Sequence, residues 1–268
     1  MSTERVDLNA DVGESFGIYA LGHDSALMPA ITSANVACGF HAGDPGVMRA
    51  TVELAREHGI AVGAHPGFPD LVGFGRREMH VSPREIEDLV AYQIGALAAI
   101  AAAQGIRLSH VKPHGALYNM AAREGALAEA IARAVAAVDH SLIVFALSGS
   151  ELVTAAARAG LRSASEVFAD RAYRADGSLV PRNTPGAMIH GTSLVVQRAV
   201  GMVQERAVVA TDGRRLRLDV DTICVHGDTP GAAELARHLR TALTTAGIEV
   251  RAVGDRTDGG RNPHTDAR

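Results

Sequence analysis

The stretch SHVKPHGALYN, residues Ser109–Asn119, contains the pattern that decides the fold of this chain. A short apolar segment, Leu108–Lys112, leads directly into polar, reactive side chains, and a helix-length segment over residues 120–138 follows. Lys112 is the only lysine of the chain, and every other basic residue is arginine. A lysine ammonium is a compact charge whose pKa shifts readily on burial. Its retention at this one position therefore indicates a chemical requirement that arginine does not meet.

Short apolar runs alternate with helix-length amphipathic segments along most of the chain, which is typical of a parallel sheet wrapped in helices. The predicted strands are Val6–Asn9, Ile31–Cys38, Ala61–Ala64, Leu108–Lys112, Leu142–Leu147, Ala164–Phe168 and Thr222–His226. The predicted helices cover residues 45–58, 83–104, 120–138, 150–159, 193–203 and 230–246. An Asp-Gly pair at residues 212–213 predicts a β-hairpin near residues 207–220.

Three of the predicted helices begin with a capping signal. Asp44 precedes a proline and can accept hydrogen bonds from the first turn of its helix. The sequence Ser82-Pro83-Arg84-Glu85 is a capping box. Thr229-Pro230, before the last helix, is again a capping residue followed by proline. These signals fix the starts of the helices better than their ends.

Length and composition favour one large α/β domain. The chain has 268 residues and 47% hydrophobic residues, enough for a single barrel of common size. Residues 1–253 are expected to form this domain, and the polar tail at residues 254–268 is expected to be disordered. No internal repeat or linker divides the chain.

The net charge of −4 argues against a nucleic-acid partner, which normally requires a basic face. The longest apolar stretch, within Ile94–Ala103, is too short to span a bilayer. No apolar leader follows the first residues, and Cys38 and Cys224 are predicted to be buried thiols rather than a disulfide. We therefore expect a cytoplasmic protein.

Nearly every predicted strand ends in polar, reactive side chains. These are Asp7, Asn9, Asp11 and Glu14 at the first strand, Asn35, His41 and Asp44 at the second, His65 at the third, Lys112 and His114 at the fourth, Glu166 and Asp170 at the sixth, and His226 and Asp228 at the seventh. In barrel enzymes the active site is assembled from loops at the carboxyl ends of the strands. The sequence therefore predicts a single-domain, TIM-like (β/α)7 barrel with one central site. A doubly wound open sheet is the alternative, but it would concentrate polar groups at one switch point.

Several of these residues also have a structural interpretation. Asp44 is explained by helix capping, and Cys38 is more often a core thiol than a nucleophile in so apolar a strand. In the loop after the third strand, Arg76 or Arg77 could clamp a carboxylate or phosphate, or could form an exposed pair. Asp7, Asn9 and Asp11 alternate along one strand, so they would share the face that points into the barrel.

Metal and nucleotide motifs are weak or absent. Aspartate and histidine from separate strand ends could bind Zn²⁺ or a similar ion, but no HExxH or paired CxxC spacing fixes the ligands. The sequence therefore assigns no metal ligands. Because Lys112 is the only lysine and no GxxxxGK[ST] motif surrounds it, a Walker-type nucleotide site is excluded.

Five separated motifs, in order along residues 5 to 250, resemble the LamB/YcsF family. They are Asp7–Glu14 (DLNADVGE), Asn35–Asp44 (NVACGFHAGD), Gly63–Gly67 (GAHPG), Val111–Asn119 (VKPHGALYN) and Cys224–Asp228 (CVHGD). The resemblance implies a barrel of the glycoside hydrolase/deacetylase type. It also implies ATP-dependent opening of 5-oxo-L-proline to L-glutamate, in a complex with 5-oxoprolinase subunits B and C.

The resemblance assigns no role to a single residue, so the roles are inferred from side-chain chemistry. Lys112 would stabilise a developing anionic oxygen or a phosphate. Asp11 or Glu14 would orient and deprotonate water, and His65 or His114 would pass a proton to the departing nitrogen. The residues expected to bind substrate are Asp7, Asn9, Asn35, His41, Arg77, Glu166 and His226.

ATP is expected as a cosubstrate whose binding site lies at least partly on the partner subunits, and the need for a further divalent metal is left open. One alternative is a stand-alone metal-dependent deacetylase or amidohydrolase at the same barrel mouth. Another is a non-catalytic subunit that binds 5-oxoproline, or a related lactam, and delivers it to its partners.

Overall fold

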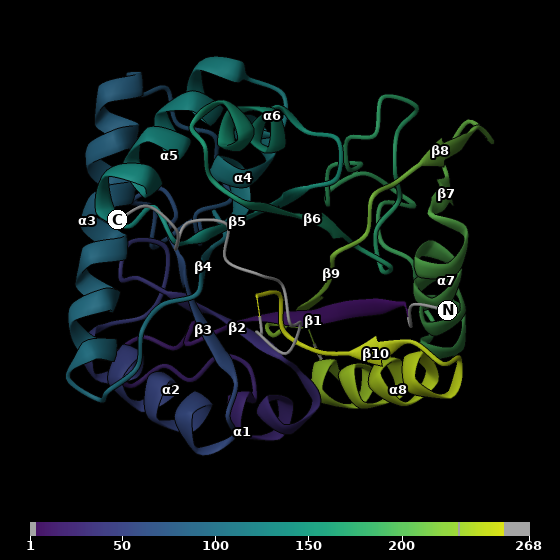
Figure 1. Ribbon diagram of the computed structural model, residues 1–268, viewed down its shortest axis with the longest axis horizontal. Coiled ribbons are helices and arrows are strands. Elements are labelled where there is room, and N and C mark those ends of the chain that lie inside the picture. The colour runs from purple at the N-terminus through teal and green to yellow at the C-terminus, as the bar shows by residue number, and fades with distance from the viewer. Residues whose placement is uncertain (1–3, 230, 255–268) are drawn as a thin grey trace, which may run out of the picture.

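Seven parallel strands form a closed barrel in the computed structural model, which describes residues 4–229 and 231–254 (Figure 1). They are β1 (Arg5–Val12), β2 (Ser33–Ala37), β3 (Ala61–His65), β4 (His110–Val111), β5 (Ile143–Leu147), β6 (Ser163–Val167) and β9 (Thr222–His226). Each strand pairs with the next, and β9 returns to pair with β1, which closes the barrel. The fold class and all seven predicted strands are confirmed, and residues 255–268 of the expected tail lie outside the described residues.

Helices surround the barrel on its outer side (Figure 1). They are α1 (Asp24–Leu27), α2 (Pro45–Glu57), α3 (Pro83–Ala102), α4 (Gly115–Ala121), α5 (Gly125–Val138), α6 (Glu151–Arg158), α7 (Thr192–Glu205) and α8 (Ala232–Thr245), with a 3₁₀ turn, η1, at Met28–Ala30. The side chains of β1 that point outward, Val6, Leu8, Ala10 and Val12, are buried against this layer. The main apolar core therefore lies between strands and helices, and the barrel interior is left to the alternate residues.

Two helix predictions are corrected. The segment over residues 120–138 is two helices, because Glu124 is extended (φ −114°, ψ 99°) and interrupts the turn pattern. The first of them starts early, at Gly115, directly after the polar cluster. Helix α8 begins after Gly231 without a side-chain cap, so Thr229 does not cap it, and Pro230 lies outside the described residues.

The other capping and hairpin predictions are confirmed. Asp44 accepts hydrogen bonds from the backbone N–H groups of Gly46 and Val47, at 2.8 and 3.0 Å. Ser82 and Glu85 form the complete capping box. The hairpin consists of β7 (Ala207–Val209) and β8 (Arg215–Arg217). A further strand that the sequence does not predict, β10 (Glu249–Val250), adds to the outer edge of β1, because two residues are too short a signal to recognise.

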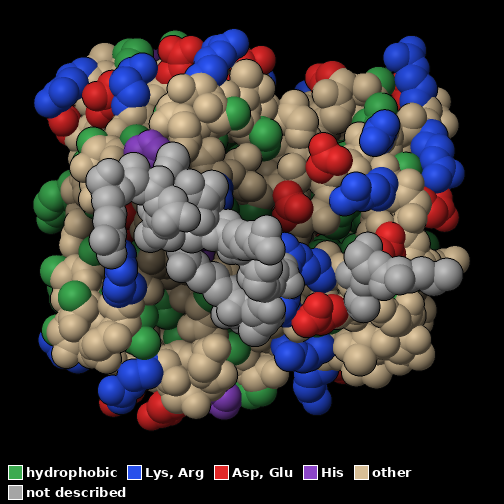
Figure 2. Space-filling view, viewed as in Figure 1, with side chains coloured by type: hydrophobic (Ala, Val, Ile, Leu, Met, Phe, Trp, Pro, Cys, Tyr) green, Lys and Arg blue, Asp and Glu red, His purple; other side chains and the backbone are tan. Residues whose placement is uncertain are grey.

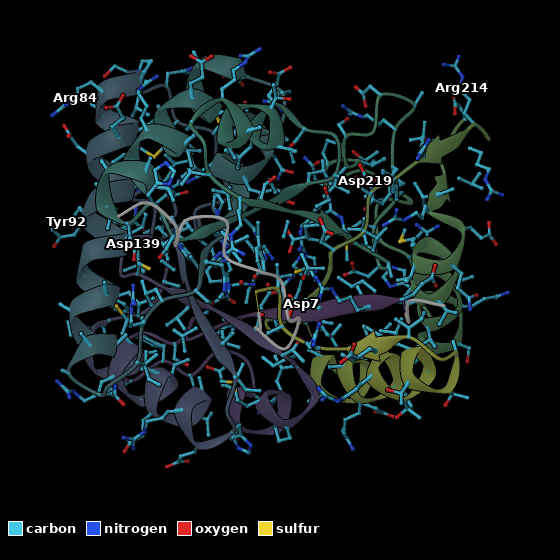
Figure 3. All side chains as sticks on the ribbon, viewed as in Figure 1. Asp7, Arg84, Tyr92, Asp139, Arg214 and Asp219 are labelled. Atoms are coloured by element: carbon cyan, nitrogen blue, oxygen red, sulfur yellow. The ribbon has the colours of Figure 1, made fainter. Side chains whose placement is uncertain are left out.

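Asp7 lies at the amino-terminal end of the barrel, away from the mouth. Its carboxylate accepts hydrogen bonds from the hydroxyls of Thr32, Ser33 and Thr222, all at the starts of neighbouring strands. Asp7 is buried and lies near the centre of the view in Figure 3, whereas Arg84 and Arg214 lie at the periphery. The structure therefore does not bring Asp7 to the mouth, where a substrate contact was expected of it. The alternation of side chains along β1 correctly predicts that Asp7 faces the barrel interior. It does not predict that Asp7 lies at the amino-terminal end of the barrel.

Asp7 makes the stability of the fold depend on pH. Burial raises its pKa to about 6, against 3.8 for the free side chain. The unfolded carboxyl therefore loses its proton at a lower pH than the folded one, so stability falls as pH rises through this window. We expect Asp7 to lower the free energy of unfolding by about 3 kcal/mol between about pH 4 and pH 7. Asp7→Asn should remove this component. Denaturant unfolding of both proteins across this range tests it, and parallel pH profiles would contradict it.

Candidate active site

The ammonium group of Lys112 lies at the centre of the barrel mouth. Its Nζ lies 2.8 Å from Asp11 Oδ1, 2.9 Å from Glu166 Oε1 and 3.2 Å from Asn9 Oδ1. It also donates to Cys224 Sγ at 2.9 Å. These partners come from β1, β6 and β9, and Lys112 itself follows β4. The side chain is buried, so the site holds one ammonium group among two carboxylates with little solvent.

Two asparagines hold this centre in place. Asn9 donates to Glu166 Oε1 at 2.9 Å and to Thr222 Oγ1 at 2.7 Å. Asn35 donates to Asn9 Oδ1 at 2.7 Å and to Asp11 Oδ1 at 2.9 Å. Both amides are fully buried beneath the carboxylates that they orient. Their contacts thus position the reactive groups from below, which is a different task from the substrate contact expected of them.

The charges of Lys112 and Asp11 stabilise each other. Burial alone would lower the pKa of Lys112, but the neighbouring carboxylates, Asp11 foremost, hold that pKa well above its ordinary value. Burial would raise the pKa of Asp11, but His65 and Lys112 hold it well below its ordinary range. The two groups therefore form an ion pair. Buried ion pairs are costly to desolvate and contribute little net stability, so this one needs a functional explanation.

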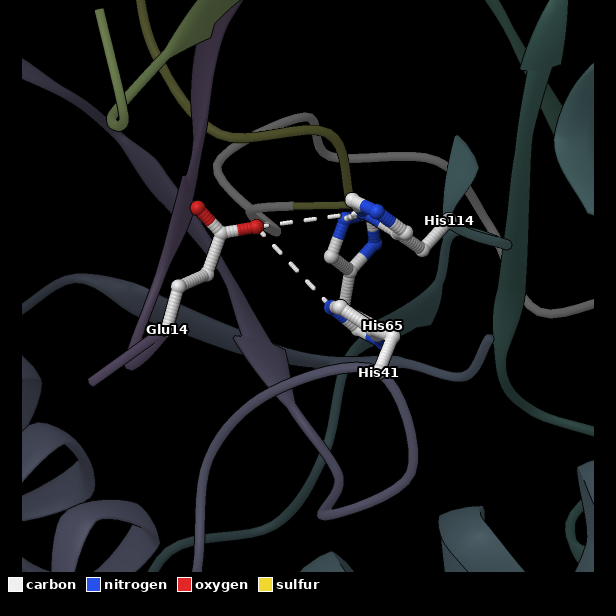
Figure 4. Close-up of side chains that lie close together, drawn as sticks. All are labelled: Glu14, His41, His65 and His114. Carbon is white, nitrogen blue, oxygen red and sulfur yellow. Dashed lines mark hydrogen bonds and ion pairs between the residues drawn. The ribbon is translucent and has the colours of Figure 1, made fainter. Parts of the chain in front are cut away.

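Glu14 and three histidines form a second cluster beside Lys112 (Figure 4). Glu14 Oε1 lies 3.9 Å from His41 Nε2 and 3.8 Å from His114 Nδ1. His114 Nδ1 lies 2.9 Å from His65 Nε2. Burial lowers the pKa of both His41 and His114 well below the ordinary value, so these rings are neutral. These four side chains could hold a metal ion.

His226 and Asp170 form a pair on the other side of the mouth. His226 Nδ1 lies 3.0 Å from Asp170 Oδ2, and its ring stacks on Phe168 with centroids 5.5 Å apart. His226 also forms a close group with Asp11 and Cys224. In the sequence, Asp170 is only one polar residue at a strand end. Its pairing partner lies 56 residues away, so no local signal reveals the pair.

Cys224 lies closer to the reactive centre than its apolar sequence context indicates. The prediction of a buried thiol is confirmed, since the side chain is buried and free. However, Cys224 lies two residues before His226 on β9, so both side chains point into the barrel, and its sulfur contacts Lys112. The alternation along β9 could have identified this contact. Cys38 is a core thiol, and burial raises its pKa to about 12.

The structure pairs Arg77, expected to bind substrate, with Asp70 and not with the Lys112 centre. Arg77 forms an ion pair with Asp70 of its own loop, and 66% of its side chain is exposed. Its neighbour Arg76 reaches across the mouth to Asp228, at 2.6 Å. The bidentate pairing of Arg77 fixes the loop after β3 instead of offering a free guanidinium. The sequence left the two arginines interchangeable, and the structure separates them.

The remaining predicted site residues come together at the carboxyl ends of the strands. They are Asp11, Glu14, His65, Lys112 and His114 among those expected to be catalytic, and Asn9, Asn35, His41, Glu166 and His226 among those expected to bind substrate. Asp11, Glu14 and His226 retain slight exposure, whereas the others are more deeply buried. A ligand entering the mouth would meet these three first.

Fold and site together define a class: TIM-like (β/α)7 barrel proteins with a buried, lysine-centred polar site at the carboxyl ends of the strands. Within this class the sequence identifies the family. The LamB/YcsF family matches residues 6–258, and the chain belongs to it.

Named relatives cover nearly the whole chain. The chain is 57% identical to the 5-oxoprolinase A subunit of Tolumonas auensis, over 93% of this chain and 99% of that protein. It is 54% identical to the 5-oxoprolinase A subunit of Bacillus subtilis, over 94% of this chain and 98% of that protein. The matched regions are long enough to include the barrel strands and the loops that carry the site.

Solved structures agree on the fold. The "Lactam Utilization Protein" of Thermus thermophilus superimposes with a TM-score of 0.88 at 52% identity, covering 92% of this chain and 99% of that one. A putative cellobiose-phosphate cleavage protein of Enterococcus faecalis V583 has a TM-score of 0.55 at 16% identity, covering 93% and 97%, which shows the fold alone. Within the described part of the chain, no helix combines the length and apolar character needed to cross a bilayer.

Proposed function

We propose that this chain is the lactam-opening subunit of an ATP-dependent 5-oxoprolinase, which converts 5-oxo-L-proline to L-glutamate together with subunits B and C. The names of its relatives support this assignment. The observation that carries it is the buried ammonium of Lys112, held 2.8 Å from the Asp11 carboxylate at the barrel mouth. Such a preorganised charge suits a reaction in which negative charge develops on a carbonyl or phosphoryl oxygen.

A five-membered lactam needs chemical activation to open. Its ring nitrogen and carbonyl carbon are held together in one molecule, so closure is favoured by proximity and plain hydrolysis has little driving force. Transfer of the γ-phosphoryl group of ATP to the lactam oxygen would supply that force. Water then adds to the activated carbon, the C–N bond breaks, and the nitrogen takes a proton. The resulting acyl phosphate reacts with a second water, which releases glutamate and phosphate.

The residues of the mouth fit these steps. Lys112 stabilises the charged oxygen, and Asp11 beside it orients the attacking water. His226 is best placed to exchange a proton with the ring nitrogen, because Asp170 orients its ring and it lies close to Asp11 and Cys224 with slight exposure. By contrast, His65 and His114 each commit one ring nitrogen to a backbone carbonyl and turn the other towards each other. Proton transfer by either is therefore less direct than by His226.

The rim of the barrel offers a surface for partner subunits. Ile18 and Tyr19, in the loop after β1, are 93% and 74% exposed, and Val72, in the loop after β3, is 93% exposed. We propose that partner subunits cover these exposed apolar side chains. Elsewhere, Figure 2 shows charges of both signs interspersed on the displayed face. The chain has no Walker motif, so the phosphate-donor site is assigned at least partly to the partners.

The proposal is tested by reconstitution. The chain is mixed with candidate B and C subunits and 5-oxo-L-proline, and glutamate release is followed with and without ATP. We expect release only when all three subunits and ATP are present. Release of acetate from an N-acetyl sugar by this chain alone, without ATP, would support a stand-alone deacetylase instead. If the complex keeps full activity after Asp11, Lys112 and His226 are replaced together, this chain has no catalytic role. It would then only bind the substrate and deliver it to its partners.

A further inference from the structure

Two groups of metal-ligand side chains lie at the mouth, among the residues that the structure describes. One consists of Asp11, Cys224 and His226, and the other of Glu14, His41, His65 and His114. The first group already contains a cation, because the Lys112 ammonium contacts both Asp11 and Cys224. In the second, Glu14 Oε1 lies 3.9 Å from His41 Nε2 and 3.8 Å from His114 Nδ1. The second group therefore has four ligand atoms and no lysine or arginine side chain among its members.

His41 has a polar ring without polar partners. The residue is fully buried, and neither Nδ1 nor Nε2 has a hydrogen-bond partner. Backbone packs tightly around it, since a Cβ atom on Gly67 would lie 2.6 Å from Nδ1 and one on Gly75 would lie 2.7 Å from the His41 Cβ. A buried polar group without a hydrogen-bond partner is energetically costly. A ligand bound between His41 and Glu14 would satisfy a ring nitrogen of His41 and so explain why this ring is buried without a polar partner.

His65 and His114 each turn one ring nitrogen towards the other and the second towards a backbone carbonyl. His65 Nδ1 lies 2.7 Å from the carbonyl oxygen of Lys112, and His114 Nε2 lies 2.8 Å from that of Phe74. A carbonyl oxygen only accepts, so both of these nitrogens carry the ring hydrogen. The remaining nitrogens, His65 Nε2 and His114 Nδ1, face each other at 2.9 Å. Metal-binding histidines typically donate their other N–H to a carbonyl or carboxylate in this way.

We propose that Glu14, His41, His65 and His114 bind one divalent metal ion of the zinc class. Three imidazole nitrogens and one carboxylate oxygen suit such an ion, with bonds of about 2.0–2.2 Å. A tetrahedral site with these bonds has ligand atoms about 3.4 Å apart. The observed separations of 2.9, 3.8 and 3.9 Å lie on both sides of that value. The rings of His41 and His114 stack at 3.8 Å, so binding requires them to open slightly towards the ion.

The metal site and the proposed lactam chemistry are independent claims that share one mouth. His65 Nε2 lies 3.5 Å from Asp11 Oδ2, so an ion in this cluster would sit beside the Lys112 centre. The ion would add a second positive charge near the position assigned to the reacting oxygen. Its presence can be measured on the chain alone, without partner subunits, ATP or substrate.

The test is metal binding by the full-length chain. The protein is stripped with a chelator and titrated with Zn²⁺ by calorimetry, and with Co²⁺ by visible absorption. We expect one equivalent bound, Co²⁺ bands of a four-coordinate site, and a higher Tm with Zn²⁺. His114→Gln and Glu14→Gln should weaken Zn²⁺ binding by more than about 100-fold, since loss of even an outer partner costs roughly 10–100-fold.

Two control variants separate the site from other binding. His226→Gln alters the group that Lys112 occupies, and His58→Gln alters an exposed histidine, so both should bind Zn²⁺ as the parent does. Circular dichroism identifies variants that fail to fold, and Glu14→Gln, at the more open edge of the cluster, then carries the test. The proposal is overturned if the parent binds no stoichiometric Zn²⁺, or if folded His114→Gln and Glu14→Gln bind it unchanged. In the first case a proton shared between His65 and His114 would explain their short separation.

Discussion

Lys112→Met is expected to lower kcat of the reconstituted complex by about 10²–10³-fold, the usual effect of removing one preorganised group that stabilises developing charge. It should also destabilise the fold by about 3–5 kcal/mol, because Asp11 and Glu166 would remain buried without their cation. Steady-state glutamate release and denaturant unfolding measure the two effects. Both expected effects are large because four side chains contact this one ammonium group.

Two further variants separate chemistry from stability. Adding Glu166→Gln to Lys112→Met removes one uncompensated charge, so it should restore part of the lost stability while activity stays low. Lys112→Arg keeps the charge, but a planar guanidinium cannot occupy the place of an ammonium with partners at 2.8–3.2 Å on several sides. We therefore expect Lys112→Arg to lose activity as severely as Lys112→Met. Wild-type turnover by Lys112→Arg would remove Lys112 from the mechanism.

The sequence predicted the barrel well because its signals are local and repeated. Short strands alternate with helices along the chain, and nearly every strand ends in polar side chains that a closed parallel barrel must bring together. Alternation along β1 correctly put Asp7, Asn9 and Asp11 on one inward face. The capping signals at Asp44 and Ser82 fixed two helix starts, because they depend on neighbours within three residues.

The differences between sequence and structure concern how far along the barrel a side chain lies and which partner it has. Both depend on residues that are distant in the sequence. Asp7 shares a face with Asp11, but only the closed barrel shows that it lies at the opposite end, among Thr and Ser hydroxyls. Arg76 and Arg77 are adjacent in the sequence. Only the folded loop shows that Arg77 pairs with Asp70 and Arg76 with Asp228. The partner of His226 was missed for the same reason. Tertiary contacts across tens of residues decide such roles, and a single sequence does not display them.

Asp11→Asn is expected to lower kcat of the complex by about 10²–10⁴-fold, the range for loss of a group that handles a proton in the transition state. The amide keeps the shape of the side chain, and its oxygen can still accept from Asn35 and Lys112. The change therefore removes negative charge and basicity with little rearrangement. Initial rates of glutamate release at saturating ATP measure the effect, and KM for 5-oxoproline should change much less than kcat.

Asp7→Asn is the matched control for Asp11→Asn. Both residues lie on β1, on the same inward face, and both substitutions exchange a buried carboxylate for an amide. They differ in depth, because Asp7 contacts strand starts and Asp11 contacts Lys112 at the strand ends. If chemistry takes place only at the mouth, Asp7→Asn alters the pH dependence of stability and leaves kcat near the parental value. Equal losses of kcat in the two variants would mean that buried charge anywhere in the barrel interior sustains activity, and the Lys112 centre would then not be the reacting site.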